Sequence, residues 1–295
     1  MTGSDLQPSV AAPGFPALPF MGASKFLMEL IMKKLAYVAM LISSIMCVQA
    51  VMAAEAITIM GDPCTVPLAK KLGAAFTRKT GKNVEIDGAS CGSGIYKASQ
   101  GDVDIGVSTH EVVLSYLPAG TVNTVIAKAP TVVVVNKNNP VNDLKLKQLK
   151  GILSGNIRNW KEVGGNDLEI KNVLLQPCTT TIFAKRSAPF GKDIKRLTPE
   201  KPGNPVEGTN KLVEENEGAL GLQIYGYEGS NVKVLTIDGL LPDAKTFPSK
   251  YDFYQDYNVV TREGANSDTK AFVDFALSPE GQEIVASLKH IGVNK

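Results

Sequence analysis

The sequence predicts an α/β fold, and three observations support this prediction. After residue 55, short apolar runs alternate with segments of helical periodicity. The run Thr131–Val135 (TVVVV) is β-branched and apolar on both faces, as expected of a central strand. Three predicted strands each end in a polar loop that leads into a helix. This strand–helix–strand order predicts parallel pairing, with helices packed on the sheet.

The predicted elements follow from periodicity and from turn residues. The predicted strands are Ala56–Met60, Asn83–Asp87, Val103–Ser108, Thr131–Val135, Val173–Leu175 and Tyr257–Thr261. Gly218–Tyr227 is predicted as a glycine-punctuated turn and strand, and Val232–Ile237 ends the second region. The predicted helices are Leu68–Lys79, Ile95–Gln100, Leu146–Leu153, Lys211–Glu217 and Thr269–Leu288. Thr198–Gly208 is rich in Pro and Gly and predicts a surface loop, and Asn136–Pro140 is irregular enough for a domain crossover.

The N-terminal residues read as a targeting segment. Met32-Lys33-Lys34 precedes an apolar run, Leu35–Met46, and small residues then offer a cleavage point after Ala53 or Ala54. We therefore assign 32–54 to a signal peptide and interpret 1–31 as a mis-annotated leader before a start at Met32. Cys47 follows the bulky Met46, which disfavours a lipid anchor, so the expected location is the periplasm.

Composition argues against one class of function, nucleic-acid binding. The chain has 295 residues, of which 44% are hydrophobic, and 31 Lys and Arg residues face 29 Asp and Glu residues. With a net charge of +2 and no basic block, nucleic-acid binding is not expected.

Beyond the signal peptide the cysteines are Cys64, Cys91 and Cys178, which allow one internal disulfide and leave one thiol over.

The loops that end the strands suit an anion. They are Gly61–Val66, Gly88–Gly94 and Gln176–Thr181. A strand-to-helix turn presents backbone N–H groups at a helix N-terminus, where the helix dipole favours negative charge. Ser and Thr add hydroxyl donors there, although the same residues also serve as ordinary helix caps. Three such loops in one chain favour an anion site.

The chain also resembles the solute-binding proteins of Pst-type phosphate ABC importers. The opening ITIMGDPCTVPLAKKLGAAFTRKTGKNVEIDGASCGSG, GDVDIGVST, LKLKQLKGILSGNIRNWKEVGG, EGALGLQIYGY and FVDFALSPEGQEIV match that family's segments in order. The resemblance spans roughly residues 56–293. It implies a two-lobed, type II-like periplasmic-binding-protein fold, with mixed sheets, helices on both faces and two crossover hinges. Lobe one is expected at 55–130 plus 256–295, and lobe two at 131–255.

The resemblance also implies a function without catalysis and without a metal or cofactor. The expected ligand is an inorganic oxyanion, with phosphate the first choice, and the expected partner is an inner-membrane ABC permease that receives it from a monomer. The implied ligand-binding residues are Cys64, Thr65, Ser90, Cys91, Gly92, Ser93, Thr109, Thr179, Thr180 and Thr181. Thr109, followed by His110, stands where the family has an Asp, and no Arg precedes Thr179 as it does in the family.

Three other interpretations compete with this one. Cys64 and Cys91 are predicted to form a disulfide that leaves Cys178 over, or the three cysteines and His110 form a zinc-like or redox site. The sequence Gly88-Ala89-Ser90-Cys91-Gly92 fits the nucleophile elbow of a serine hydrolase, with His290 as the remaining histidine. That histidine is otherwise expected at the surface or at a helix cap. The late aromatic residues Tyr225, Tyr227, Tyr251, Phe253, Tyr254 and Tyr257 are interpreted mainly as core or hinge packing.

Overall fold

The computed structural model describes residues 28–36, 56–90, 92–186, 190–201, 203–243, 245–247 and 249–293. Residues 28–36 are helical and belong to a unit, 1–54, separate from the compact unit 55–295. The predicted leader and signal peptide, including Cys47, otherwise lie outside the described residues. Among the described helices, none combines the length and the apolar character needed to cross a bilayer.

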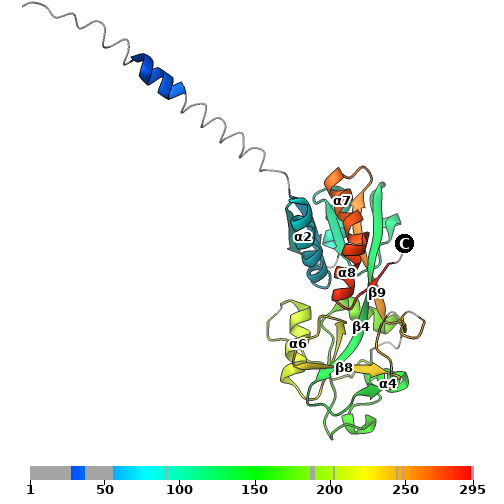
Figure 1. Cartoon of the computed structure of the whole chain (residues 1–295). Coiled ribbons are helices and arrows are strands. Elements are labelled where there is room, and N and C mark those ends of the chain that lie inside the picture. The colour runs from blue at the N-terminus through cyan, green and yellow to red at the C-terminus, as the bar shows by residue number, and fades with distance from the viewer. Residues whose placement is uncertain are drawn as a thin grey trace, which may run out of the picture. The chain divides into compact units, whose positions relative to one another are not determined.

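The compact unit is a mixed α/β structure (Figure 1). Its strands are β1 (Ile57–Gly61), β2 (Val84–Gly88), β3 (Ile105–Ser108), β4 (Thr121–Asn136), β5 (Asp143–Leu144), β6 (Lys171–Val173), β7 (Ala219–Ile224), β8 (Val232–Ile237), β9 (Tyr254–Arg262) and β10 (Ile291–Gly292). Its helices are α2 (Val66–Thr80), α3 (Ser93–Gln100), α4 (Leu146–Ser154), α5 (Pro177–Arg186), α6 (Pro205–Glu215), α7 (Ser267–Leu277) and α8 (Pro279–Ser287). Two short 3-10 helices cover Leu114–Tyr116 and Trp160–Val163.

The sheet is mixed, with the strand order β2-β1-β3-β9-β4-β7-β6. β1 pairs in parallel with β2 and β3, as the strand–helix–strand order predicts, because α2 and α3 carry the chain back between them. β6 and β7 are also parallel. β9 is antiparallel to β3 and β4, and β4 is antiparallel to β7, so the expectation of parallel pairing holds only within each group.

The long strand β4 joins the two lobes. Up to Pro130 it pairs with β9, and from Thr131 it pairs with β7. Figure 1 shows β4 and β9 running between a part that contains α2, α7 and α8 and a part that contains α4, α6 and β8. The crossover therefore lies inside β4, and the expectation that Asn136–Pro140 would carry it is wrong. The exact lobe limits, 55–130 plus 256–295 and 131–255, stay a prediction.

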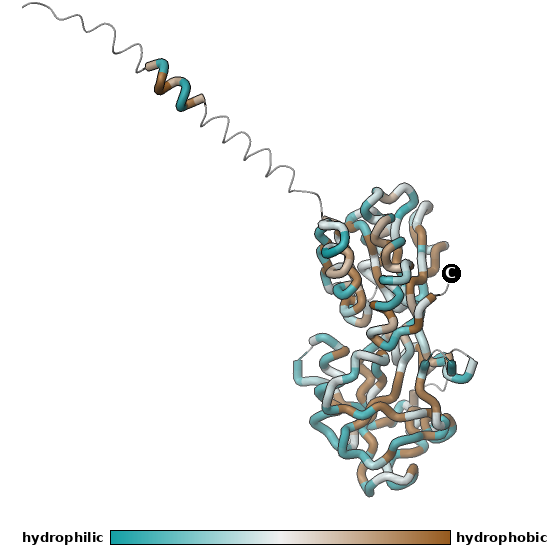
Figure 2. The backbone as a smooth tube through the Cα atoms, in the orientation of Figure 1, coloured by the Kyte–Doolittle hydropathy of each residue, from teal (hydrophilic) through white to brown (hydrophobic). Residues whose placement is uncertain are grey.

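Each lobe has its own apolar core. One cluster includes Leu68 and Phe76 from α2 with Phe272 from α7, and a second includes Trp160 and Phe183. Figure 2 shows the apolar residues concentrated along the central strands. Four buried residues from the 131–255 segment, Cys178, Val206, Ile224 and Tyr227, pack in the first cluster, so the two lobes are in contact.

Two helix boundaries differ from the prediction. The predicted single helix Thr269–Leu288 is two helices, because Ser278 ends α7 and its side chain accepts a hydrogen bond from the Gly281 amide at the start of α8. The predicted loop Thr198–Gly208 ends early, because α6 begins at Pro205. Asn204 caps α6, and proline suits the first helical position, where no N–H is needed.

Candidate ligand-binding site

The carboxyl ends of β1, β2 and β3 meet at one edge of the sheet. Gly61 pairs with Gly88 on one side and with Val107 on the other, and the Ala89 amide donates to the Gly61 carbonyl at 2.7 Å. At Gly94 an added Cβ would overlap the Met60 carbonyl oxygen, so glycine lets the start of α3 pack directly on β1. The predicted convergence of the first two polar loops is therefore present.

Asp62 organises this edge, although the sequence interpretation had not selected it. Its carboxylate accepts hydrogen bonds from the Cys64 amide at 2.9 Å, the Ser108 hydroxyl at 3.2 Å and the Thr109 amide at 3.4 Å. The side chain is 1% exposed. Burial raises the pKa of this carboxyl above its usual value, against the lowering effect of the hydrogen bonds. A Gly-Asp-Pro turn at the end of a strand was the signal for it.

The loop from lobe two reaches the same place through a sulfur contact. Cys64 Sγ and Cys178 Sγ lie 2.7 Å apart, and both residues are 2% exposed. Cys178 belongs to the first turn of α5, so the predicted loop Gln176–Thr181 is mostly the beginning of that helix. The Cys64 thiol also lies 3.7 Å from Gln176 Oε1, and the Gln176 amide donates to Gln223 Oε1 at 2.7 Å.

Around the sulfur contact lie three buried polar atoms without a hydrogen-bond partner in the described part of the chain. They are Thr109 Oγ1, His110 Nε2 and the Tyr227 hydroxyl. Thr109 lies close enough to Cys178 to favour its thiolate, and His110 is an electrostatic neighbour of Asp62. Burial raises the pKa of the Tyr227 hydroxyl, and Cys64 and Asp62 add to this. Unpartnered polar groups are costly in a protein interior, so such a group points to a missing partner such as a ligand.

The other predicted ligand residues fall into two groups. The hydroxyls of Thr65, Thr179 and Thr180 donate to main-chain carbonyls, at 2.8 Å, 3.0 Å and 3.0 Å, and so hold their own turns. A second group lies at or near the surface: Ser90, Gly92 and Thr181 are exposed, and Ser93 is half-buried with its hydroxyl bonded to the Ser90 carbonyl. Cys91 lies outside the described residues. A ligand role for these residues stays a prediction.

The competing interpretations find less support. Cys64 and Cys178 are in sulfur contact without a disulfide between them, and the predicted partner Cys91 lies outside the described residues, so the Cys64–Cys91 disulfide stays a prediction. Within the described ranges no group of three or more His, Cys, Asp or Glu residues is arranged to hold a metal ion.

The arrangement of a serine hydrolase is also not formed. The Ser90 hydroxyl lies 3.2 Å from Ser93 Oγ, whereas both ring nitrogens of His290 lack a hydrogen-bond partner in the described chain. The expectation that His290 would be a surface or capping residue is wrong. It is 3% exposed and packs edge-on against Tyr227, with ring centroids 5.3 Å apart.

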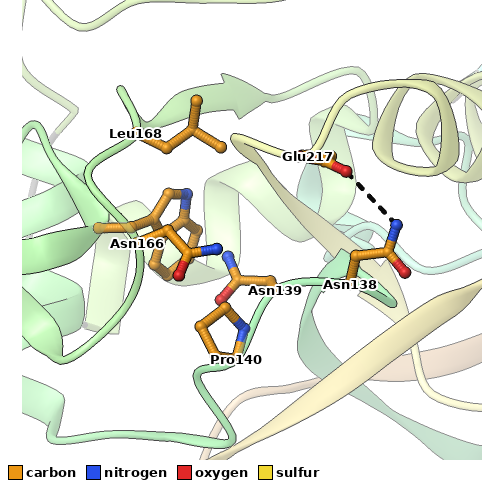
Figure 3. A pocket seen from close by; sticks show the side chains of 7 residues that line it. Asn138, Asn139, Pro140, Asn166, Leu168 and Glu217 are labelled. Atoms are coloured by element: carbon orange, nitrogen blue, oxygen red, sulfur yellow. Dashed lines mark hydrogen bonds between the residues drawn. The ribbon is translucent and has the colours of Figure 1, made fainter.

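A small cavity lies in lobe two, away from the sulfur contact. Figure 3 shows its polar lining, including the side chain of Asn138, whose amide donates to Glu217 at 3.4 Å. The cavity is lined by Asn138, Asn139, Pro140, Trp160, Asn166, Leu168 and Glu217. Its volume of about 10 Å³ suits one water molecule rather than an oxyanion. Two wider grooves, beside α2 and beside α6, contain no predicted ligand residue either.

Comparison with known proteins gives consistent results. Residues 49–280 match a family model described as a PBP superfamily domain. The phosphate-binding protein PstS of Bacillus subtilis is 26% identical over 242 residues, which cover 80% of this chain and 79% of that protein. A solved structure from Clostridium perfringens is described as a phosphate ABC transporter substrate-binding protein with bound phosphate. It is 28% identical to this chain with a TM-score of 0.72, and the match covers 81% of this chain and 100% of the Clostridium perfringens chain. An ABC-type phosphate transport receptor from Vibrio cholerae shares the fold, with a TM-score of 0.62, 22% identity, and coverage of 80% of this chain and 100% of its own.

Proposed function

The chain belongs to the PBP superfamily, and from this premise we propose that it is an exported solute-binding protein that captures inorganic phosphate and delivers it to the permease of an ABC importer. It would act as a monomer and without catalysis. The relatives compared above are binding proteins of phosphate transport, which supports this assignment.

The observation that carries the proposal is the set of unpartnered polar atoms at the contact between the lobes. Thr109 Oγ1, directly after β3, and the Tyr227 hydroxyl, shortly after β7, are buried donors without a hydrogen-bond partner in the described residues. An oxyanion offers acceptors for both. The N-termini of α2 and α5 meet at the same point through Cys64 and Cys178, and their backbone amides add positive potential.

Asp62 would then supply selectivity. A carboxylate has about four lone-pair positions, and the three hydrogen bonds described above leave capacity for one more. Phosphate near neutral pH carries a proton that it can donate to such an acceptor, whereas sulfate carries none. We therefore expect the site to prefer phosphate and the variant Asp62→Asn to lose much of that preference.

Calorimetry on protein freed of bound anion tests the proposal. Phosphate is expected to bind with measurable heat, and sulfate and molybdate more weakly. Thr109→Val and Tyr227→Phe should each weaken phosphate binding by about tenfold, because each removes one buried hydrogen bond to the ligand. The matched controls are Thr121→Val and Tyr116→Phe, of which Tyr116 is 87% exposed.

Two results would count against the proposal. One is the absence of any heat with phosphate in anion-free protein. The other is a loss of binding in Thr121→Val and Tyr116→Phe equal to that in Thr109→Val and Tyr227→Phe. N-terminal sequencing of the protein recovered outside the cytoplasm would test export separately, and cleavage is expected after Ala53 or Ala54.

A further inference from the structure

The two lobes touch through a pair of cysteines. Cys64 lies in the turn between β1 and α2, and Cys178 lies in the first turn of α5, 114 positions further along the chain. Their sulfurs are 2.7 Å apart and both residues are almost fully buried. We propose that Cys64 and Cys178 form a reversible disulfide that fastens lobe one to lobe two across the ligand site.

Both cysteines are held on rigid elements. The Cys64 amide donates to Asp62 at 2.9 Å, which fixes the β1–α2 turn. Helix α5 is anchored in the core of lobe two by Phe183, whose ring stacks on Phe253 with centroids 4.5 Å apart. Gln176, which immediately precedes α5, is itself tied to Gln223. The sulfurs therefore meet because the lobes meet, and no loop has to rearrange to bring them together.

The surroundings also suit thiol chemistry. A hydrogen bond from the Cys64 thiol lowers the pKa of Cys178 below its usual value, and burial and the nearby charge of Asp62 act in the opposite direction. Cys178 lies at a helix N-terminus, a position that stabilises a thiolate. Cys178 is thus the attacking thiol and Cys64 the resolving one.

The reaction is a thiol–disulfide exchange with an external disulfide oxidant. The Cys178 thiolate attacks one sulfur of the oxidant, which forms a mixed disulfide and releases the oxidant's first thiolate. The Cys64 thiolate then attacks Sγ of Cys178 and releases the second. The cysteine pair loses two electrons and two protons, and the oxidant gains them as two thiols. A dithiol reductant reverses the exchange.

Burial makes the reaction depend on lobe opening. With both residues 2% exposed, an oxidant reaches the sulfurs only when the lobes separate. Once the internal disulfide has formed, it restrains the separation of the lobes, so a ligand enters and leaves more slowly, while the remaining opening still admits a small dithiol reductant. The ion pair between Lys185 on α5 and Glu111 after β3, at 3.6 Å, joins the lobes as well but is exposed and weak. The gating consequence rests on the proposed phosphate function, whereas the disulfide itself does not.

The test uses the full chain carrying Cys47→Ala and Cys91→Ala, which leaves Cys64 and Cys178 of the four cysteines. After incubation with glutathione disulfide, thiol titration in denaturant is expected to fall from two thiols per molecule to none. Mass spectrometry should find a loss of two hydrogens and a peptide pair linked through residues 64 and 178. Variants that add Cys64→Ser or Cys178→Ser should form no internal link.

Phosphate exchange is measured on the same oxidised and reduced samples. Oxidation of the phosphate-loaded protein is expected to slow release of labelled phosphate by about tenfold or more, with full recovery after dithiothreitol, because closure acts on the dissociation rate. Release from the Cys178→Ser variant should not respond to the oxidant.

The outcomes are separable. The disulfide proposal would be wrong if two thiols per molecule could still be titrated after the oxidant. It would also be wrong if the thiols escaped titration only because they held zinc, and became titratable once a chelator removed the metal. A disulfide that forms without changing phosphate release would overturn the gating. A disulfide in a protein that gives no heat with phosphate would leave the linkage standing and remove the proposed function instead.

Discussion

At the scale of single residues, the unusual groups are buried polar side chains at the junction of the lobes. His290 is the clearest case, because its ring is 3% exposed and neither nitrogen has a hydrogen-bond partner in the described chain. Burial alone lowers its pKa to about 4, since a charged imidazole would lose its hydration there. The ring is therefore neutral in the folded protein over most of the pH range.

This depressed pKa predicts a loss of stability in acid. The unfolded chain binds a proton at the ordinary histidine pKa of 6.5, whereas the folded protein does so only near 4. The stabilisation that comes from keeping His290 neutral is thus fully present above pH 6.5. As the pH falls towards 4, the unfolding free energy drops by about 3 kcal/mol. Urea unfolding at pH 7, 5 and 4 measures it.

The variant His290→Leu is the matching test, because it fills the same space with an apolar side chain and gives up no side-chain hydrogen bond seen in the described part of the chain. It should lose much less stability than the wild type between pH 7 and pH 4. An identical acid loss in both proteins would assign the effect to other groups and contradict the account of His290.

At the scale of elements, the sequence predicted most strands but misjudged how they combine. TVVVV is recognisable because it is buried on both faces, whereas the first half of β4, from Thr121, mixes exposed and buried positions and has no such pattern. Pro205 and Pro279 are the first residues of α6 and α8. The predicted loop Thr198–Gly208 and the predicted helix Thr269–Leu288 nevertheless ran across them. The antiparallel pairing of β9 with β3 and β4 depends on contacts distant in sequence, which local periodicity does not contain.

The candidate site was predicted in the same partial way. The loops were found from glycine and hydroxyl residues, and two of the three meet at Gly61. Asp62 was missed because one acidic residue in a Gly-Asp-Pro turn is ordinary. Tyr227 was missed because a tyrosine in an aromatic run is usually core, and only the fold shows that its hydroxyl has no hydrogen-bond partner among the described residues. The Cys64–Cys178 pair joins two lobes, and sequence spacing gives no indication of such a contact.

The turn after β7 makes an element-scale prediction. Gly226 has φ +99°, and an added Cβ would overlap the Leu288 carbonyl oxygen just after α8. Gly239 has φ +75°, but a Cβ added there would meet no atom within 4 Å. A substitution at Gly239 therefore measures the cost of the backbone conformation alone. We expect Gly239→Ala to cost about 1 kcal/mol and Gly226→Ala about 3 kcal/mol or more, because the clash adds to the strain. Equal losses in urea unfolding would contradict this contact.

At the scale of the whole molecule, the lobes are held together by a few contacts of different kinds. Besides the cysteine pair, the segment around Gly226 packs against the end of α8, where Lys289 pairs with Glu228 and its ammonium lies 4.4 Å from the centre of the Tyr225 ring. The Tyr257 hydroxyl, buried in β9, donates to the Thr65 carbonyl and ties the β1–α2 turn to the crossing strands. A ligand placed among these contacts would strengthen the whole junction.

Phosphate is accordingly expected to stabilise the entire compact unit. At a concentration one hundred times its dissociation constant, a ligand that binds only the folded state adds about 2.7 kcal/mol to the unfolding free energy. Urea unfolding followed by Trp160 fluorescence measures it, because this single tryptophan is buried in lobe two and bonded to the Gly218 carbonyl. Sulfate at the same concentration serves as the control. A phosphate effect no larger than that of sulfate would contradict specific binding.

The sixteen residues of β4 also constrain how this protein can be divided. Since residues 121–130 pair with β9 and residues 131–136 pair with β7 and β8, a gene fragment that encodes a single lobe cuts this strand but leaves each piece its own partners. What the cut exposes is the apolar contact between the lobes, where Val206, Ile224 and Tyr227 lose their neighbours in the first cluster. Attempts to produce either lobe as a separate soluble polypeptide should therefore start with polar substitutions at that contact rather than with adjustments to the position of the cut.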